Sequence, residues 1–448
     1  MQREYVAKRL PKLAGRAAWS AILGALPAAR PLQGNVTADF TVIGAGFAGL
    51  SAARRLVQLN PGAKVVVLDA ARVGEGGTGR NSGFMIDLPH NLASQNYAGA
   101  NEGLDRSLIS LNRMAIEFAR EAVQDYGIDA NYFDPAGKIN GAATESSQAQ
   151  NKSYGAHLQR LGERYEVLDE QAMLEVTGSR YYLSGLYTPG TVMLQPAGYV
   201  RGWAQGLSRE VAIHEESPVT AFCRQGASWR VETSGGAVST DKIILANNGH
   251  IESFGISRGR LMHIFLFASM TEELSEDALR RLGGQPRWGI TPSDPMGATI
   301  RRTDTGQGGN RIAIRTCAEF RPDMESTEYK MRRAAKIMRR KFDERFPQIR
   351  DVRMEYAWSG QLCLSRNDVS VTGEIDSSVY AACCQNGLGT TRGTLTGIAA
   401  AECASGKSSV ITEFFAGQAK PSLLPPAPLA KLGATAYLNW KGWRARRE

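Results

Sequence analysis

The sequence predicts a two-domain α/β protein built around a Rossmann-like dinucleotide-binding unit. Its 448 residues are too many for one compact core, so two domains are expected. Near the N-terminus, a glycine-rich turn lies between a short apolar strand and a helical pattern. A strand, a glycine turn and a helical pattern follow one another again from residue 379, far along the chain.

The bulk composition is that of an ordinary globular protein, with 43% apolar and 22% charged residues. The net charge of +9 can attract anionic partners but says nothing about the fold. We expect no nucleic-acid binding, because the basic residues accompany no recognised reading module. The six cysteines show no CxxC or Cys/His zinc spacing, which favours a reduced, cytoplasmic protein without a metal site. No apolar run approaches the roughly 20 residues of a spanning helix.

The first 35 residues begin basic and continue apolar, in the manner of a weak secretory signal. Pro11, Gly15 and Arg16 interrupt that pattern. We therefore expect a surface arm packed on the body of the protein, with export as the alternative.

The strongest motif runs from residue 40 to residue 69. Residues 40–43 form a short β-branched strand, the glycine turn follows at 44–49, and residues 50–57 have a helical pattern. Residues 64–68 are a second strand that ends in Asp69. Because the GxGxxG motif follows a strand and opens a helix that leads to a second strand, it predicts a dinucleotide-binding site.

Each glycine of the motif has a physical task. Gly44 permits the tight turn, Gly46 lets a pyrophosphate approach the backbone, and Gly49 lets the helix pack on the strand. The helix N-terminus offers unpaired N–H groups and the positive end of its dipole to the phosphates. Asp69 stands where a carboxylate accepts hydrogen bonds from ribose hydroxyls. The predicted cofactor contacts of this unit are Gly44, Gly46, Phe47, Ala48, Gly49, Asp69 and Ala70.

The segment after the second strand favours FAD over NAD. A nicotinamide dehydrogenase would normally continue into a third strand here, whereas residues 72–84 form a long polar loop. Such a loop can wrap an extended dinucleotide and place its arginines and amides against phosphate and flavin oxygens. Its predicted cofactor contacts are Arg72, Gly77, Thr78, Arg80, Asn81, Ser82 and Gly83.

Two later segments are expected to return to the same site. Residues 211–238 are rich in β-formers, and the strand after them ends in a small-residue turn beside the dinucleotide. The strand from 379 ends in a second glycine turn before the helical pattern 395–403, whose N–H groups can stabilise charge on a reduced flavin. Between them, residues 256–345 mix strands with a helix at about 327–345. The predicted cofactor contacts are Val219, Asn248, Gly249, Gly387, Leu388, Gly389 and Thr390.

Five blocks of sequence, at residues 42–51, 79–83, 244–248, 356–360 and 386–389, together resemble the D-amino-acid-oxidase-type flavoprotein superfamily. Within it the chain is similar to the gamma-glutamylputrescine oxidoreductase group of bacterial amine oxidases. The resemblance covers the chain from about Asp39 to the C-terminus.

This resemblance implies an FAD-binding domain of the glutathione-reductase-like ββα sheet type, assembled from separated segments. It also implies an α+β substrate domain whose large antiparallel sheet covers the reacting face of the flavin. The implied reaction is hydride transfer from a carbon next to nitrogen to flavin N5, giving an imine that water hydrolyses. The expected division is an N-terminal arm (1–35), an FAD-binding domain (36–105, 185–255 and 346–420), a substrate domain (106–184 and 256–345) and a basic tail (421–448).

The chain departs from the group in two places that bear on the substrate. A proline-bearing stretch is missing after the block at 356–360, and residues 84–87 are less polar than expected. The implied substrate is therefore only a small amine or amino acid. Alternatives are an FAD-dependent dehydrogenase of a 2-hydroxy acid or polyol, and a non-catalytic flavin-binding or tRNA-modification protein.

Three residues are candidates for catalysis: His263, Trp358 and Asn386. His263 opens an apolar strand from which it could reach the flavin, although a structural role is common for such a histidine. The resemblance places Cys363 near a cysteine that binds flavin covalently in sarcosine-oxidase-type members, but a buried, inert thiol and non-covalent FAD are expected. One of Arg301, Arg302 and Arg315 could pair with a substrate carboxylate.

The C-terminal residues 432–448 are basic and rich in aromatic side chains. A basic amphipathic segment of this kind can lie on an anionic membrane, so peripheral membrane contact is left open. Oxygen and a quinone both remain open as the electron acceptor.

Overall fold

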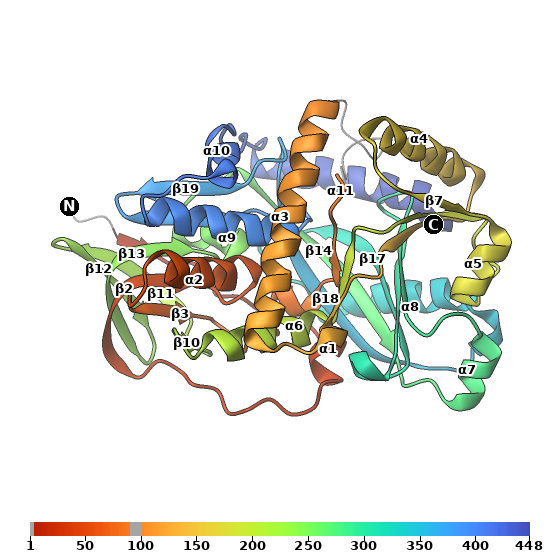
Figure 1. Ribbon diagram of the computed structural model, residues 1–448, viewed down its shortest axis with the longest axis horizontal. Coiled ribbons are helices and arrows are strands. Elements are labelled where there is room, and N and C mark those ends of the chain that lie inside the picture. Colours follow the sequence, from red (N-terminus) through yellow and green to blue (C-terminus); the bar gives the residue numbers. More distant parts are fainter. Residues whose placement is uncertain (1–3, 90–100) are drawn as a thin grey trace.

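The computed structural model describes residues 4–89 and 101–448. Two large sheets dominate the fold and lie beside each other in Figure 1, with the elements of the first sheet on the left and those of the second on the right. The chain passes between the two sheets several times, so each is assembled from separated segments.

The first sheet has a parallel centre in the order β10-β3-β2-β13-β20. Strand β3 and the final residues of β2 and β13 are buried and rich in valine, isoleucine and leucine, as expected of strands covered on both faces. An antiparallel extension, β1-β11-β12, continues from β13, and β19 pairs with β20. The strands are β1 (Glu4–Val6), β2 (Gly34–Ile43), β3 (Val65–Leu68), β10 (Ala212–His214), β11 (Val219–Gln225), β12 (Ser228–Thr233), β13 (Gly236–Leu245), β19 (Val371–Asp376) and β20 (Val379–Cys383).

Helices α2 (Phe47–Leu59) and α9 (Thr391–Ala404) pack against each other on one face of this sheet. Their close approach depends on Gly397, where a Cβ atom would lie 2.1 Å from the Ala48 carbonyl oxygen. The two predicted glycine turns are therefore brought together in two ways. Helices α2 and α9 pack against each other, and strands β2 and β20 both pair with β13.

The second sheet has the strand order β18-β14-β17-β16-β15-β6-β8-β7. Its neighbours are antiparallel except for β15 and β6, so the expected antiparallel sheet is a mixed, mostly antiparallel one. Helix α8 (Glu328–Arg345) packs on β14, β17 and β18. The strands are β6 (Lys138–Ala142), β7 (Glu166–Leu168), β8 (Ser184–Thr188), β14 (Leu261–Thr271), β15 (Trp288–Pro292), β16 (Thr299–Thr303), β17 (Arg311–Phe320) and β18 (Met354–Ser365).

A small third sheet has the strand order β4-β9-β5. Its strands are β4 (Phe84–Met85), β5 (Phe133–Asp134) and β9 (Val192–Leu194). The remaining helices are α1 (Ala18–Ala21), α3 (Glu102–Tyr126), α4 (Glu145–Leu161), α5 (Glu170–Thr177), α6 (Pro196–Leu207), α7 (Glu276–Leu282), α10 (Val410–Ala416) and α11 (Ala427–Arg444).

The N-terminal segment is tied to the body at several points. Strand β1 pairs with β11, and helix α1 buries Trp19 almost completely. The N-terminal segment thus contacts both the first sheet and the loop that ends in β4.

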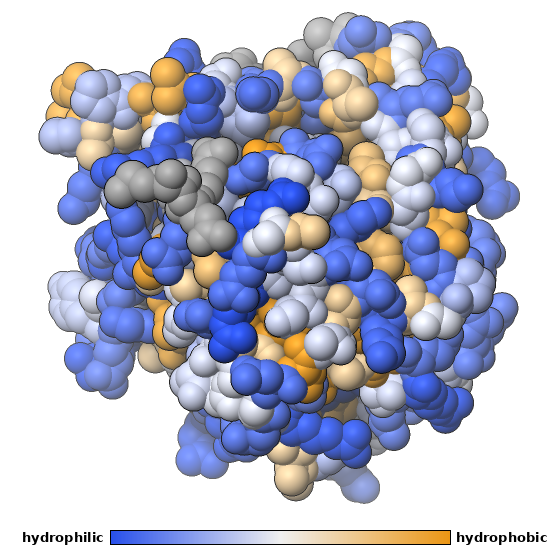
Figure 2. All heavy atoms as spheres, turned by 90° about the vertical axis from the view of Figure 1, so that its left-hand side faces the viewer, coloured by the Kyte–Doolittle hydropathy of each residue, from blue (hydrophilic) through white to orange (hydrophobic). Residues whose placement is uncertain are grey.

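The face that looks to the left in Figure 1 is mainly hydrophilic, with apolar side chains in small groups (Figure 2). Within residues 4–89 and 101–448, no helix is both long and apolar enough to cross a membrane.

Candidate active site

The first glycine turn joins β2 to α2 and leaves no room for side chains. Gly44 has φ +110°, and a Cβ atom there would lie 2.7 Å from the Ala246 carbonyl oxygen. A Cβ atom on Gly49 would lie 1.7 Å from the Gly44 carbonyl oxygen, which explains why this third glycine is needed. Gly46 is the N-cap of α2 and supplies no side-chain cap, so the first N–H groups of the helix are left to a ligand.

Asp69 fixes the other side of this turn. Its carboxylate accepts hydrogen bonds from the Ala45 N–H (2.7 Å) and the Ala71 N–H (2.9 Å). Desolvation raises the pKa of Asp69, and the two N–H groups partly oppose that rise. The carboxylate therefore holds the turn in shape while it remains in the cavity wall.

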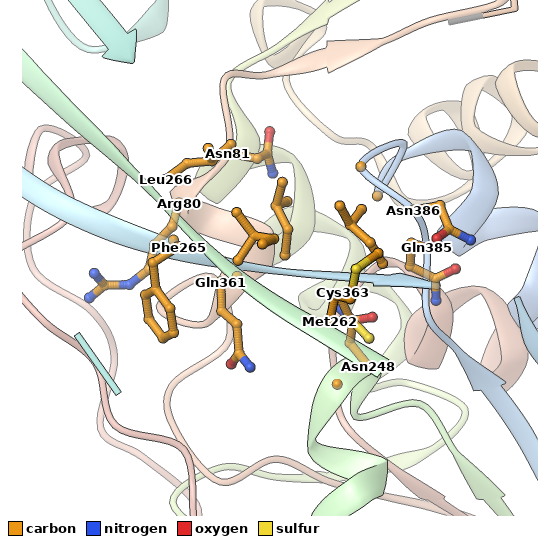
Figure 3. A pocket seen from close by; sticks show the side chains of 18 of the residues that line it. Arg80, Asn81, Asn248, Met262, Phe265, Leu266, Gln361, Cys363, Gln385 and Asn386 are labelled. Carbon is orange, nitrogen blue, oxygen red and sulfur yellow. The ribbon is translucent and has the colours of Figure 1, made fainter. Parts of the chain in front are cut away.

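Arg80 joins three separate segments through main-chain carbonyls. Its guanidinium donates to Ala14 (3.0 Å), Gly15 (3.0 Å) and Ser359 (3.1 Å). Burial lowers its pKa to about 10, and Glu75 opposes that fall. In Figure 3 the charged end of Arg80 points away from the other labelled side chains, so it braces the site from behind.

Two buried indoles hold the backbone next to Arg80. Trp358 Nε1 donates to the Arg80 carbonyl (3.1 Å), and Trp19 Nε1 donates to the Asn81 carbonyl (2.9 Å). Trp358, predicted as catalytic, is 1% exposed and does not line the cavity. Its observed contact is with the loop that lines the cavity.

Arg301 holds the backbone of the next residues in this loop. This fully buried guanidinium donates to the carbonyls of Gly83 (2.7 Å), Ser82 (3.2 Å) and Leu194 (3.3 Å). Burial lowers its pKa to about 9. Arg302 likewise donates to a carbonyl, that of Gly283 (2.5 Å). Neither arginine lines the cavity, so neither is placed to meet a substrate carboxylate.

The second glycine turn joins β20 to α9. Asn386 adopts φ +49°, and its side chain accepts from the Ser365 N–H (2.7 Å) and donates to the Val369 carbonyl (3.0 Å). Thr390, the N-cap of α9, provides no side-chain cap and instead donates its hydroxyl to the Phe84 carbonyl (2.8 Å). Apart from the Arg392 N–H, which donates to the Leu388 carbonyl (3.0 Å), the N–H groups at the start of α9 are thus also left to a ligand.

Both turns open into one cavity of about 840 Å³. All predicted cofactor contacts line it except Gly49, Arg72 and Gly83, and Asn386 lines it as well. Gly49 and Gly83 are packed against backbone, whereas Arg72 is paired with Glu215 (2.9 Å). The structure therefore brings together residues that lie more than 300 positions apart in the sequence.

The opposite wall of the cavity comes from β14, β17 and β18. Met262 and Phe265 of β14 and Gln361 of β18 line the cavity and are among the side chains drawn in Figure 3. Arg315 lines the same cavity from β17 and donates to the Thr299 hydroxyl (2.6 Å). This wall is mainly apolar, with few polar groups, as is usual for a small-molecule site.

His263 lies behind this wall instead of in it. Its Nε2 is 2.7 Å from Glu252 Oε2, and its Nδ1 is 3.2 Å from Gln361 Nε2. The cavity is instead lined by His250. Desolvation and the neighbouring His263 lower the pKa of His250 to about 4, so its ring is neutral near pH 7.

Cys363 lines the cavity next to two other buried thiols. A hydrogen bond with Cys384 and burial raise the pKa of Cys363 well above its ordinary value. Because the thiolate is the reactive form of cysteine, this environment opposes nucleophilic reaction with a flavin.

Sequence reasoning missed two parts of the site. Residues 9–13 of the N-terminal arm and the inner side of α11 both line the cavity. No local pattern marks either segment, because their place depends on how the chain ends pack on the body. Gln361 was missed because its place depends on the pairing of β18 with β14.

The residues present fit an FAD molecule. Two uncapped helix N-termini face one cavity, and a side chain at Gly46 would come within 2.6 Å of Thr78 Oγ1. Such a cradle suits a diphosphate that approaches the backbone, while the apolar wall suits a flat ring.

The sequence profile of the family described as DAO, FAD dependent oxidoreductase, matches residues 39–403. The chain belongs to this family. FAD is therefore its cofactor, and oxidation–reduction is its class of chemistry.

Individual relatives are distant. The chain is 26% identical to the probable oxidoreductase OrdL of Haemophilus influenzae, over 88% of each chain. It is also 26% identical to the gamma-glutamylputrescine oxidoreductase of Escherichia coli, over 86% of this chain and 87% of that one. The glycine oxidase of Geobacillus kaustophilus has a similar fold, with a TM-score of 0.68 and 16% identity over 84% of this chain and 96% of that one.

Proposed function

We propose that this member of the family oxidises the C–N bond of a small amine or amino acid. The observation that carries the proposal is the shared cavity, in which the two glycine turns face the apolar wall of β14, β17 and β18. Bound FAD supplies a two-electron acceptor for the hydride of a carbon next to nitrogen. The names of the Escherichia coli and Geobacillus kaustophilus proteins, an oxidoreductase of an amine derivative and an amino-acid oxidase, support this substrate class.

The protein's own residues fit a substrate amine bound in its neutral form. Met262 and Phe265 exclude water and lower the local dielectric, which disfavours an ammonium ion. Arg315 adds positive charge to the same cavity and disfavours the ammonium further. A neutral amine has its lone pair available, so the reaction needs no strong general base from the protein.

Of the three candidate arginines, Arg315 lines the cavity and can meet a substrate carboxylate there, in contrast to the buried Arg301 and Arg302. Guanidinium groups bind carboxylates in a fork geometry. We therefore infer that amino acids or amines bearing a carboxylate are favoured over simple amines. The R315Q variant should raise KM for carboxylate-bearing substrates while leaving KM for simple amines nearly unchanged. R332Q, an exposed arginine on α8, is the matched control.

Product analysis tests the reaction class. Release of ammonia or an amine together with a carbonyl product supports C–N oxidation. A keto product without released nitrogen, formed from a hydroxy acid, would support the 2-hydroxy acid or polyol alternative. A bound flavin that no substrate reduces would support a non-catalytic role.

The proposed cofactor contacts are the predicted residues that line the cavity, which excludes Gly49, Arg72 and Gly83. The proposed mode of binding is non-covalent. The proposed electron acceptor is oxygen or a quinone. Comparing the rate of flavin reoxidation by oxygen with the rate in vesicles that carry a quinone distinguishes the two. A cytoplasmic location with peripheral membrane contact remains our proposal.

A further inference from the structure

Helix α11 is held at both ends across the mouth of the cavity. Before the helix, the Leu424 N–H donates to the Gly259 carbonyl (2.8 Å). After it, the Ala298 N–H donates to the Glu448 carbonyl (3.1 Å), and the Glu448 carboxylate accepts from the Thr144 hydroxyl (2.7 Å). Glu448 is buried, although no residue of α11 is. The helix is thus fixed at both ends, and one side of it lies against β17.

The inner side of α11 forms part of the cavity wall. Leu429, Gly433, Tyr437 and Lys441 line the cavity at a spacing of four residues, which places them on one side of a helix. Whatever covers the outer side of α11 therefore lies one helix diameter from the site.

Helix α11 also exposes large apolar and aromatic side chains. Leu432 is 72% exposed and Trp443 is 62% exposed, and Trp440 is also exposed. Two exposed tryptophans so close together are costly for a surface that meets only water. This cluster indicates a surface that is covered in use.

The charge around this cluster has a single sign. From residue 414 to residue 447 the sequence has six basic residues and no aspartate or glutamate. Among the described residues, the basic side chains of α11 and the turn after it form no ion pair with a carboxylate. They lie over rings instead, with Arg444 5.2 Å from the centre of Trp440 and Arg446 4.5 Å from that of Trp443.

Helix α8 provides an internal contrast. It has eight basic residues, more than α11, and it exposes Tyr329. Four of these cations are paired with acidic neighbours, such as Lys330 with Glu319 (3.2 Å) and Arg332 with Glu328 (3.2 Å). The charge on α8 is therefore partly balanced by carboxylates, whereas that on α11 is available to an external anion.

We propose that α11 docks the enzyme on an anionic lipid bilayer, with its tryptophans at the interface and its basic residues at the lipid phosphates. Aromatic rings that combine an apolar body with a polar edge prefer that interface, and lysine and arginine are drawn to anionic headgroups. A second copy of the chain is a poorer partner, because it would bring two uncompensated basic surfaces together. Docking places the cavity mouth at the bilayer surface.

Co-sedimentation of the FAD-loaded, full-length enzyme with vesicles tests the proposal. Binding should be strong to phosphatidylcholine vesicles containing phosphatidylglycerol, weak to phosphatidylcholine alone, and reduced by salt. R444Q/R446Q should weaken binding roughly 30-fold, from about 1 kcal/mol for each charge near an anionic surface. W440S/W443S should also release the enzyme, while Y329S on α8 should not.

An unchanged visible flavin spectrum shows that each variant is folded, so loss of binding cannot be confused with unfolding. The proposal is overturned if the wild-type enzyme ignores anionic vesicles, or if W440S/W443S binds them as the wild type does. It is also overturned if the same substitutions only dissociate a dimer or release bound nucleic acid. Vesicle binding does not require turnover, so the proposal stands or fails independently of the substrate.

Discussion

His263 Nε2 lies 2.7 Å from Glu252 Oε2, and its other ring nitrogen faces the amide of Gln361. Both nitrogens are thus engaged away from the cavity. This geometry gives His263 an indirect role, in which it orients the Gln361 side chain that lines the cavity.

The H263N variant tests that role. We expect flavin reduction to slow by less than about tenfold, because a general base would instead cost roughly 10²–10⁴ in rate. We also expect a loss of about 1–3 kcal/mol in the free energy of unfolding, since Glu252 loses a buried partner. Stopped-flow reduction and urea unfolding measure the two effects. A rate loss above a hundredfold in a variant of native stability would assign His263 a direct part in catalysis.

His250 makes stability depend on pH in the mildly acidic range. Its pKa is about 4 in the folded protein and 6.5 ordinarily, so between these values the unfolded chain binds a proton that the folded protein does not. Stability is therefore full above pH 6.5 and falls as the pH is lowered toward 4, by about 1–3 kcal/mol from this group. Urea unfolding at pH 7 and pH 5 should show a smaller difference for H250N than for the wild type. An equal difference would contradict the assignment.

The first glycine turn can be blocked without disturbing the rest of the fold. In G46V the new side chain would occupy the space between the turn and Thr78, where the diphosphate is proposed to bind. We expect a folded protein that loses at least about 90% of its FAD, since the backbone can no longer be approached. The ratio of visible to ultraviolet absorbance measures this loss. G442A, on an open part of α11, is the control and should keep its flavin.

Cys363 should not hold the flavin covalently. Its neighbour Cys384 and its burial keep the thiol protonated, so it is a weak nucleophile. After acid precipitation, all the flavin should appear in the supernatant. Yellow colour that remains in the pellet of the wild type and disappears in C363S would show a covalent bond.

Much of the fold was accessible from local patterns. The β-branched run before Gly44 and the helical run after it form β2 and α2, and the strands expected within residues 256–345 include β14, β16 and β17. Helix α8 also appears where its apolar spacing predicted it. These elements carry their own periodicity, which the tertiary structure does not override.

The site was harder to predict from the sequence, because burial decides the roles of its polar residues. Arg301 and Arg315 stand on neighbouring strands with similar sequence surroundings, yet one is buried against carbonyls and the other lines the cavity. The parallel pair β15 and β6 likewise depends on contacts between distant segments. Sequence spacing cannot report such contacts.

The most direct measurement is an anaerobic titration of the purified enzyme with amines and amino acids, each compared with the corresponding hydroxy acid, while the visible absorbance of the flavin is followed. The account predicts a yellow protein that is bleached by at least one amine or amino acid and by none of the hydroxy acids. A protein that stays colourless when FAD is supplied, or one that only hydroxy acids bleach, would contradict it.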